Sequence, residues 1–214
     1  MFELFDEAPK AGPFSILTVC TGNICRSPLA ASLLRRELRG LPVSVTSAGT
    51  RAMEGAPMDA PMRRIAEELD LHDATRHQAR QITAEAVAEA DLVLALAREH
   101  RRATVELVPR ANRTAFTLRE FARLVPHAAV DGFGADPGDA GARMRLAVTR
   151  AAQARGAAAP PDSPEDDEVV DPFGSSHEVY ERSRAQLVPA VRTVAEFLRA
   201  AAAPAGAGSA EVRT

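Results

Sequence analysis

Several residue types are scarce in this chain of 214 residues, and each shortage excludes a class of protein. Two cysteines are too few for a framework of disulfide bonds, which favours a reducing compartment such as the cytoplasm. No run approaches the roughly 18 apolar residues of a membrane-spanning helix, so we expect no membrane segment. The first residues carry acids and lack the apolar stretch of a signal peptide, which indicates a protein that is not exported.

The basic residues are nearly all arginine, since Lys10 is the only lysine. The composition indicates a bacterial protein, because arginine and alanine are abundant as in proteins from GC-rich genomes. The formal net charge is −3, so nothing in the charge favours nucleic acid as a partner. Hydrophobic residues make up 46% of the chain, enough for the core of one domain.

Short apolar segments alternate along the chain with segments of helical periodicity. The predicted strands cover residues 14–20, 43–49, 90–97 and 114–118. The predicted helices cover residues 27–40, 57–71, 83–90, 98–108, 119–125, 143–159 and 176–202, the last with a bend at Pro189. This alternation predicts an α/β fold, in which a parallel sheet is flanked by helices on both faces.

The composition of the chain divides it into a domain and its flanks. We expect residues 1–13 to form an N-terminal arm, residues 14–202 a single domain and residues 203–214 a disordered tail. Residues 127–168 are rich in turn residues, arginine, acids and proline, and we interpret them as a helical, acidic insertion. Its charged residues are expected to lie on the surface.

Both cysteines lie in one short segment, Val19–Pro28, between the first strand and the first helix. Cys20 and Cys25 lack the C-x2-C spacing of a zinc site, no second pair exists, and the five histidines are scattered. We therefore expect no metal. A disulfide staple and a nucleophile within an anion-binding turn are the other interpretations of this segment.

The position of this segment favours a nucleophile. A turn from a strand to a helix N-terminus presents N–H groups and a positive dipole to an anion, and the same field stabilises a thiolate at Cys20. The guanidinium of Arg26 can bind two phosphate oxygens together. Gly22 allows the backbone angles of such a turn, and the Asn23 side chain can lock it. Ser27 can either cap the helix or donate to the Cys20 sulfur.

A purely structural interpretation is available for each of these residues alone. Lone buried cysteines usually fill the core, and a serine before a proline at a helix start is usually only a cap. The whole string Cys-Thr-Gly-Asn-Ile-Cys-Arg-Ser-Pro between a strand and a helix is far more specific. The sequence therefore favours the nucleophile over the core interpretation.

This string, Cys20–Pro28, resembles the phosphate-binding loop of the low-molecular-weight protein tyrosine phosphatases. Ser47–Thr50 resembles the second-strand motif of that family, and His77–Thr83 resembles its H-x-A-R-Q-[VIL]-T segment. Asp171–Gly174 resembles its Asp-Pro-aromatic acid loop. The resemblance implies a four-stranded parallel sheet in the order 2-1-3-4, with the insertion before the acid loop.

The resemblance also implies roles for individual residues. Cys20 would attack phosphorus and become a phosphocysteine, and Asp171 would protonate the leaving oxygen and then activate water. Cys25 would pair reversibly with Cys20 to protect it from oxidation. Asn23 would hold the loop through Ser47. The residues expected to bind the phosphate are Thr21, Gly22, Asn23, Ile24, Cys25, Arg26 and Ser27.

Some positions depart from the family pattern. The aromatic residue that usually lines the phenol slot is missing, so Met53 is expected to take its place, with Ile24 and Phe173 as the other pocket residues. Ala31 stands where the family has a glutamate, so we expect His77 to lack its usual partner and leave it outside the catalytic set. Asp136, which also precedes a proline, is a rival for the acid.

The sequence thus predicts a metal-independent phosphomonoester hydrolase, a protein-tyrosine phosphatase that needs no cofactor. Its partner would be a phosphorylated protein or a small phosphomonoester. One alternative is an arsenate reductase that draws electrons from a low-molecular-weight thiol, because the chain has no cysteines beyond the loop to relay them. The other alternative is a non-catalytic module that only binds phosphate.

Overall fold

The computed structural model of this chain describes residues 12–128 and 139–204. Most of the predicted tail, most of the predicted N-terminal arm and the rival acid Asp136 lie outside the described residues. Among the helices of the described residues, none is long and apolar enough to cross a membrane.

The strands form one parallel sheet. They are β1 (Phe14–Cys20), β2 (Val43–Gly49), β3 (Leu92–Ala95) and β4 (Ala115–Thr117). Their order is β2-β1-β3-β4, which confirms the expected 2-1-3-4 arrangement. Cys20 pairs with Gly49, and Val19 pairs with Ala95, so the carboxyl ends of β1, β2 and β3 meet at one edge.

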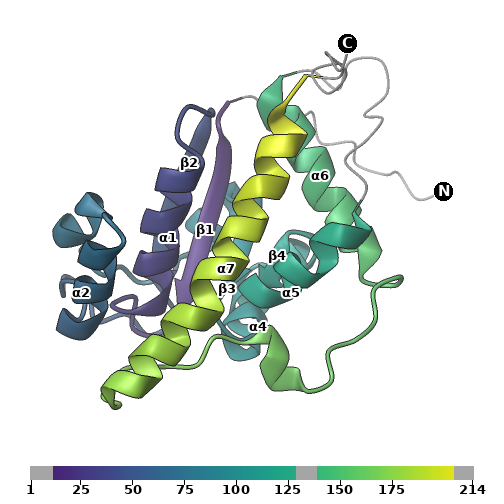
Figure 1. The fold of residues 1–214 in the computed structure, drawn as a ribbon. Coiled ribbons are helices and arrows are strands. Elements are labelled where there is room, and N and C mark those ends of the chain that lie inside the picture. The colour runs from purple at the N-terminus through teal and green to yellow at the C-terminus, as the bar shows by residue number, and fades with distance from the viewer. Residues whose placement is uncertain (1–11, 129–138, 205–214) are drawn as a thin grey trace, which may run out of the picture.

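Helices cover both faces of this sheet. They are α1 (Arg26–Glu37), α2 (Ala60–Glu68), α3 (Ala84–Glu89), α4 (Arg98–Leu107), α5 (Leu118–Leu124), α6 (Ala140–Ala154) and α7 (His177–Ala202), with the short turns η1 (His72–Arg76), η2 (Pro109–Arg113), η3 (Val125–His127) and η4 (Pro164–Asp167). Figure 1 shows α1 and α7 in front of β1 and β3, and the two helices contact each other. This arrangement confirms the predicted α/β class.

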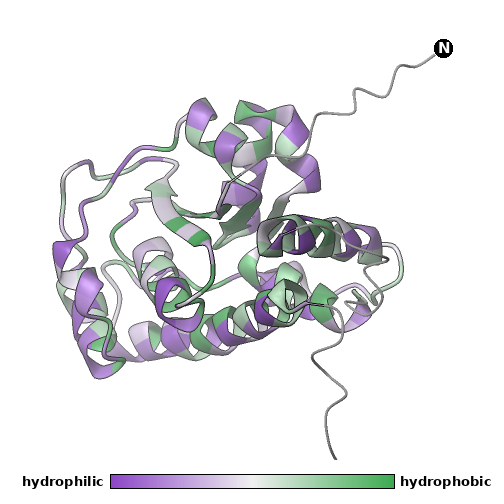
Figure 2. Cartoon of the chain, turned by 90° about the horizontal axis from the view of Figure 1, so that it is seen from above, coloured by the Kyte–Doolittle hydropathy of each residue, from purple (hydrophilic) through white to green (hydrophobic). Residues whose placement is uncertain are grey.

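Alternating side chains of β1 supply two separate cores. Phe14 and Ile16 belong to the larger core, which also takes the apolar faces of α1, α2, α5, α6 and α7. Leu17 and Val19 point the other way, into a smaller core against α3 and α4. Burial of consecutive residues, with side chains that alternate between the two faces, is typical of a covered parallel strand. Figure 2 shows helices that carry hydrophobic and hydrophilic residues on the same ribbon, as expected of helices that cover a sheet.

The predicted helices are present, with ends that differ by a few residues: α6 begins at Ala140 and ends at Ala154, where we predicted 143–159. The helix predicted at residues 57–71 is limited to α2, which begins after Asp59. Thr83 caps α3 as expected, since its hydroxyl accepts from Ala86 N. The final helix runs through Pro189 without ending.

The segment interpreted as an insertion is packed into the domain over its helical part. Met144, Ala147 and Ala151 of α6 are fully buried in the larger core. Arg145 pairs with the buried Asp91, and Arg155 pairs with Glu120 of α5. These two arginines are therefore partly buried and form ion pairs between elements, whereas we expected the charged residues of this segment to lie on the solvated surface. The extent of the insertion, 127–168, stays a prediction.

Candidate active site

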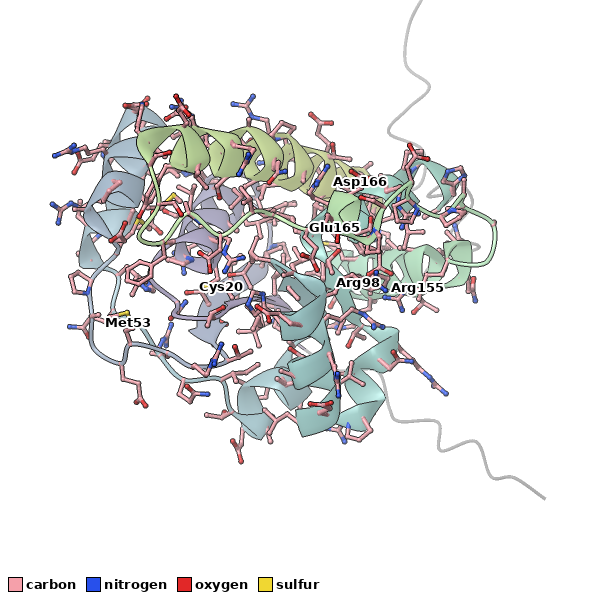
Figure 3. The ribbon with its side chains drawn as sticks, turned by 90° about the horizontal axis from the view of Figure 1, so that it is seen from below. Cys20, Met53, Arg98, Arg155, Glu165 and Asp166 are labelled. Carbon is pink, nitrogen blue, oxygen red and sulfur yellow. The ribbon has the colours of Figure 1, made fainter. Side chains whose placement is uncertain are left out.

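The turn between β1 and α1 lies at the carboxyl edge of the sheet. Because β1 ends at Cys20 and α1 begins at Arg26, only residues 21–25 form the turn. Figure 3, which views the molecule from below, shows Cys20 between Met53 on one side and Arg98 on the other. Ligands of open α/β folds bind at this edge of the sheet.

The carbonyl groups of this turn point outward, because each accepts a hydrogen bond from a donor outside it. The pairs are Cys20 O with Thr50 N, Thr21 O with Arg51 N, Gly22 O with Met53 N, Asn23 O with His77 Nε2, Ile24 O with Asp59 N and Cys25 O with Leu29 N. Because the N–H of a planar peptide points opposite to the carbonyl, the N–H groups of residues 21–26 face the centre of the turn. We call these six N–H groups the amide bowl. None of them forms a hydrogen bond within the described residues, so the bowl offers an anion a set of unused donors.

Asn23 gives the turn its shape. It is the residue with a left-handed backbone, at φ 54°, a conformation that asparagine tolerates. Its Nδ2 donates to Ser27 Oγ over 2.9 Å, and its Oδ1 accepts from Arg80 N over 2.8 Å. We expected Gly22 to take the unusual backbone angle and Ser47 to be the partner of Asn23. In the structure Asn23 takes both the angle and other partners, because its short side chain can bond both sides of the turn at once.

The Ser27 hydroxyl contacts the proposed nucleophile. Cys20 Sγ and Ser27 Oγ are 3.0 Å apart, and both residues are buried. The N-cap position of α1 is Cys25, and no side chain caps the helix there. Of the two uses predicted for Ser27, the structure therefore shows the contact with the sulfur.

Arg26 and Asp171, 145 residues apart in sequence, meet beside the bowl. Arg26 Nη2 lies 2.5 Å from Asp171 Oδ2, and Arg26 Nη1 donates to Val169 O over 3.1 Å. Arg26 is only 4% exposed, and its buried Nε has no hydrogen-bond partner among the described residues. Asp171 is about half exposed. Arg26 therefore keeps unused N–H donors, among them Nε, and it lines the same cavity as the acid.

A cavity of about 160 Å³ opens above the sulfur. The residues that line it are Cys20, Thr21, Gly22, Ile24, Cys25, Arg26, Arg51, Met53, Asp171 and Phe173. Ile24 is buried at 6% exposure, whereas Met53 and Phe173 are 48% and 53% exposed. The structure thus brings together all three predicted pocket residues with Cys20, Arg26 and Asp171, and gives the cavity a polar floor below an apolar mouth.

The surroundings of Cys25 disfavour its ionisation. Burial raises the pKa of the Cys25 thiol far above its ordinary value, and the nearby Asp59, Cys20 and Asp171 raise it further. Cys25 therefore stays a neutral thiol near pH 7. Both cysteines are free thiols in the structure.

Three residues that we did not predict as site residues support the turn. His77 Nε2 donates to Asn23 O over 2.6 Å, so His77 has a structural partner although the family glutamate is missing. Gly49 packs so closely beneath the turn that a Cβ there would lie 2.5 Å from Thr21 O. His100 of α4 contacts Thr21, with 2.8 Å between Nε2 and Oγ1. The sequence could have indicated His100 as a site residue by its position, since it follows the carboxyl end of β3.

In residues 12–128 and 139–204, no group of three or more histidine, cysteine, aspartate or glutamate side chains is arranged to hold a metal ion.

Residues 15–144 match the family described as low molecular weight phosphotyrosine protein phosphatase. The chain is 31% identical over 188 residues to a protein-arginine-phosphatase of Geobacillus stearothermophilus, which covers 87% of this chain and 97% of the relative. It is 40% identical over 106 residues to a probable low molecular weight protein-tyrosine-phosphatase EpsP of Ralstonia solanacearum, which covers 50% of this chain and 71% of the relative.

Solved structures give the same result. The YwlE arginine phosphatase from Geobacillus stearothermophilus matches with a TM-score of 0.61 and 31% identity, over 87% of this chain and 94% of that one. A YwlE arginine phosphatase mutant with a phosphorylated active-site serine matches with a TM-score of 0.58 and 27% identity. That match covers 87% of this chain and 96% of the other.

Proposed function

This chain belongs to the low molecular weight phosphotyrosine protein phosphatase family, whose relatives named protein-tyrosine-phosphatases are phosphoric monoester hydrolases, and on that premise we propose that it hydrolyses phosphotyrosine esters of proteins at Cys20. The observation that carries the proposal is the amide bowl around a buried sulfur, with Arg26 and Asp171 beside it. Six N–H donors and a guanidinium suit the phosphoryl dianion of such an ester.

In the proposed reaction, the Cys20 thiolate attacks phosphorus and the bond from phosphorus to the tyrosine oxygen breaks. Asp171 gives its proton to the departing oxygen, so tyrosine leaves as a neutral phenol. Asp171 then takes a proton from water, the water oxygen attacks phosphorus, and the Cys20 thiolate and inorganic phosphate are released. The YwlE mutant with a phosphorylated active-site serine supports a covalent step of this kind.

The other groups at the site have supporting roles in this proposal. The amide bowl and Arg26 bind the equatorial oxygens, whose negative charge they stabilise in the transition state. The phosphoryl oxygens would take the place of Asp171 Oδ2 on Arg26 Nη2, which frees the acid for the leaving oxygen. The Ser27 hydroxyl, 3.0 Å from Cys20 Sγ, would stabilise the sulfur when it departs as thiolate.

The mouth of the cavity favours phosphotyrosine over phosphoarginine. Ile24, Met53 and Phe173 would pack against the two faces and the edge of a phenol ring. The guanidinium of a phosphoarginine would instead lie between these apolar side chains and near the cation Arg51. We further propose that the protein works in the cytoplasm, because its nucleophile has to stay a reduced thiol.

Hydrolysis of p-nitrophenyl phosphate with EDTA present tests the proposed function. The wild type should turn over the ester, whereas Cys20→Ser should bind inorganic phosphate without turnover. Asp171→Asn should lower kcat by roughly 10²–10⁴-fold, as expected for the loss of a general acid. A reduced wild type that binds phosphate without turnover would identify a binding module instead.

Two further arms of this experiment identify the substrate. A phosphotyrosine peptide and the matching phosphoarginine peptide should differ in kcat/KM in favour of phosphotyrosine. The opposite preference would show that this chain is an arginine phosphatase, the activity for which the Geobacillus protein is named. Reduction of arsenate in the presence of a low-molecular-weight thiol, without ester hydrolysis, would support the reductase alternative.

A further inference from the structure

A buried histidine contacts the residue next to the nucleophile. His100 lies in the first turn of α4 and is only 1% exposed. Its Nε2 is 2.8 Å from Thr21 Oγ1, and Thr21 directly follows Cys20. The reaction proposed above gives no role to this pair of side chains.

The surroundings of His100 decide which partner donates. The carboxylate oxygen Glu99 Oε1 lies 3.3 Å from the same Nε2, whereas the buried Nδ1 has no partner in the part of the chain that the structure describes. A proton on Nε2 can be donated to Thr21 Oγ1 or Glu99 Oε1, whereas a proton on Nδ1 would be a buried donor without an acceptor. Burial, followed by the nearby charges of Arg26 and Arg51, lowers the pKa of His100 to about 3. His100 is therefore a neutral imidazole that donates from Nε2 to Thr21 Oγ1.

This direction of donation leaves the hydroxyl hydrogen of Thr21 unused. Within the described residues, Thr21 Oγ1 has no hydrogen-bond partner other than His100. Thr21 also lines the cavity above Cys20 together with Arg26. We propose that the Thr21 hydroxyl is a further hydrogen-bond donor to the bound phosphoryl group, and that His100 is the positioning residue that holds it. This inference rests on the proposed function, since it assigns an added donor to the same site.

The first turn of α4 is a suitable support for such a donor. Leu96, at the end of β3, donates to Val19 O and accepts from Val169 N, which joins β1 to the acid loop. Arg98 N, at the start of α4, donates to Glu168 Oε1 over 3.0 Å. The same turn therefore fixes both the segment that leads to Asp171 and the histidine that contacts Thr21. Figure 3 shows Arg98 and Glu165 on the same side of Cys20.

Matched variants separate positioning from packing. Thr21→Val removes the hydroxyl and keeps the shape, whereas Thr21→Ser keeps the hydroxyl. His100→Gln places an amide N–H near the position of Nε2 and can still donate, whereas His100→Leu fills similar space without a donor. Arg102→Ala, on the exposed side of α4, is the control for changes in the helix itself.

The test measures the affinity for inorganic phosphate by calorimetry and kcat/KM for p-nitrophenyl phosphate, with thermal denaturation to verify folding. Thr21→Val should lower both quantities by roughly 10- to 100-fold, the range for a hydrogen bond to a charged group. Thr21→Ser should keep most of the phosphate affinity and kcat/KM that Thr21→Val loses, and His100→Gln should keep most of what His100→Leu loses. The double variant Thr21→Val/His100→Leu should have the same affinity and kcat/KM as Thr21→Val alone, because the two changes remove the same hydrogen-bond donor.

The inference is overturned if folded Thr21→Val stays within twofold of the wild type in both measurements. It is also overturned if His100→Gln is no better than His100→Leu, since packing alone would then explain the histidine. A failure of the proposed function gives a different pattern, because the wild type would lack turnover while phosphate affinity still followed the Thr21 and His100 variants.

Discussion

Gly49 shows how little space surrounds the phosphate-binding turn. It ends β2 directly beside Cys20, and Gly49 N donates to Arg80 O. An added Cβ would lie 2.5 Å from Thr21 O and 3.0 Å from Asn23 N. Both atoms belong to the backbone of the turn, so no side chain could rotate away to make room. The shape of the amide bowl therefore depends on a residue outside it.

Gly49→Ala should consequently impair function more than stability. We expect kcat/KM for p-nitrophenyl phosphate and the affinity for inorganic phosphate to fall by about 10²-fold or more, because a displacement of about 1 Å can have that effect. Gly156→Ala is the control, since a Cβ there would meet no atom closer than 4.0 Å. Steady-state kinetics and phosphate calorimetry on both variants make the comparison. Unchanged kinetics in Gly49→Ala would mean that the turn can shift without loss.

At the scale of elements, Arg155 connects the end of α6 to the sheet. Its Nε pairs with Glu120 of α5 at 2.8 Å, and its Nη2 donates to Ala115 O of β4 at the same distance. Its guanidinium also lies over the ring of Phe116, 4.0 Å from the ring centre. Glu120 in turn completes the capping box of α5 with Thr117. One side chain thus holds three elements together.

Arg155→Ala should lower the free energy of unfolding by about 2–3 kcal/mol, because it removes the ion pair with Glu120, the hydrogen bond to Ala115 O and the contact with Phe116. Phosphatase activity at low temperature should be unchanged, since Arg155 does not contact the bowl. The control is Arg102→Ala, whose pair with Glu106 is largely exposed and should contribute about 0.5 kcal/mol or less. Urea denaturation measures both variants. Equal losses in the two would show that Arg155 contributes no more to stability than an exposed ion pair.

At the scale of the whole molecule, the buried His100 couples stability to pH. Its pKa is about 3 in the folded chain and near 6.5 in the unfolded chain. Between these values the unfolded chain binds a proton that the folded chain does not, so acid favours unfolding. His77 acts in the same direction, because burial lowers its pKa as well. Above about pH 6.5 both histidines are neutral in either state and contribute no pH dependence.

The free energy of unfolding should therefore fall as the pH drops below about 6.5, with a contribution from His100 of up to about 1.4 kcal/mol per pH unit. His100→Gln removes this titration. As the pH falls towards 4, the free energy of unfolding of the wild type should therefore decrease more than that of the variant. Urea denaturation at several pH values between 4 and 8 measures this difference. A difference that stays constant over that range would contradict a neutral, buried His100.

Local pattern was sufficient for most of the fold. Short runs of apolar and β-branched residues predicted β1 and β2 with the ends that the structure has. The ends of α2 were misplaced, since helical periodicity continues beyond the residues that hydrogen bonds and packing keep helical. The surroundings of Arg155 could not be predicted either, because a charged residue on a helix looks the same whether its partner is water or a distant carboxylate.

The sequence by itself determined the chemistry of the site: a thiol, an arginine and a run of small residues between a strand and a helix, where backbone N–H groups and the helix dipole gather at the end of a parallel strand. Only the tertiary structure decided how that turn is held. Asn23 rather than Gly22 takes the left-handed backbone, and His77 and His100 approach from segments more than 50 residues away. The physical reason is that spacing along the chain encodes local hydrogen bonds, whereas the partners of an outward carbonyl or a buried imidazole depend on which distant elements pack against them.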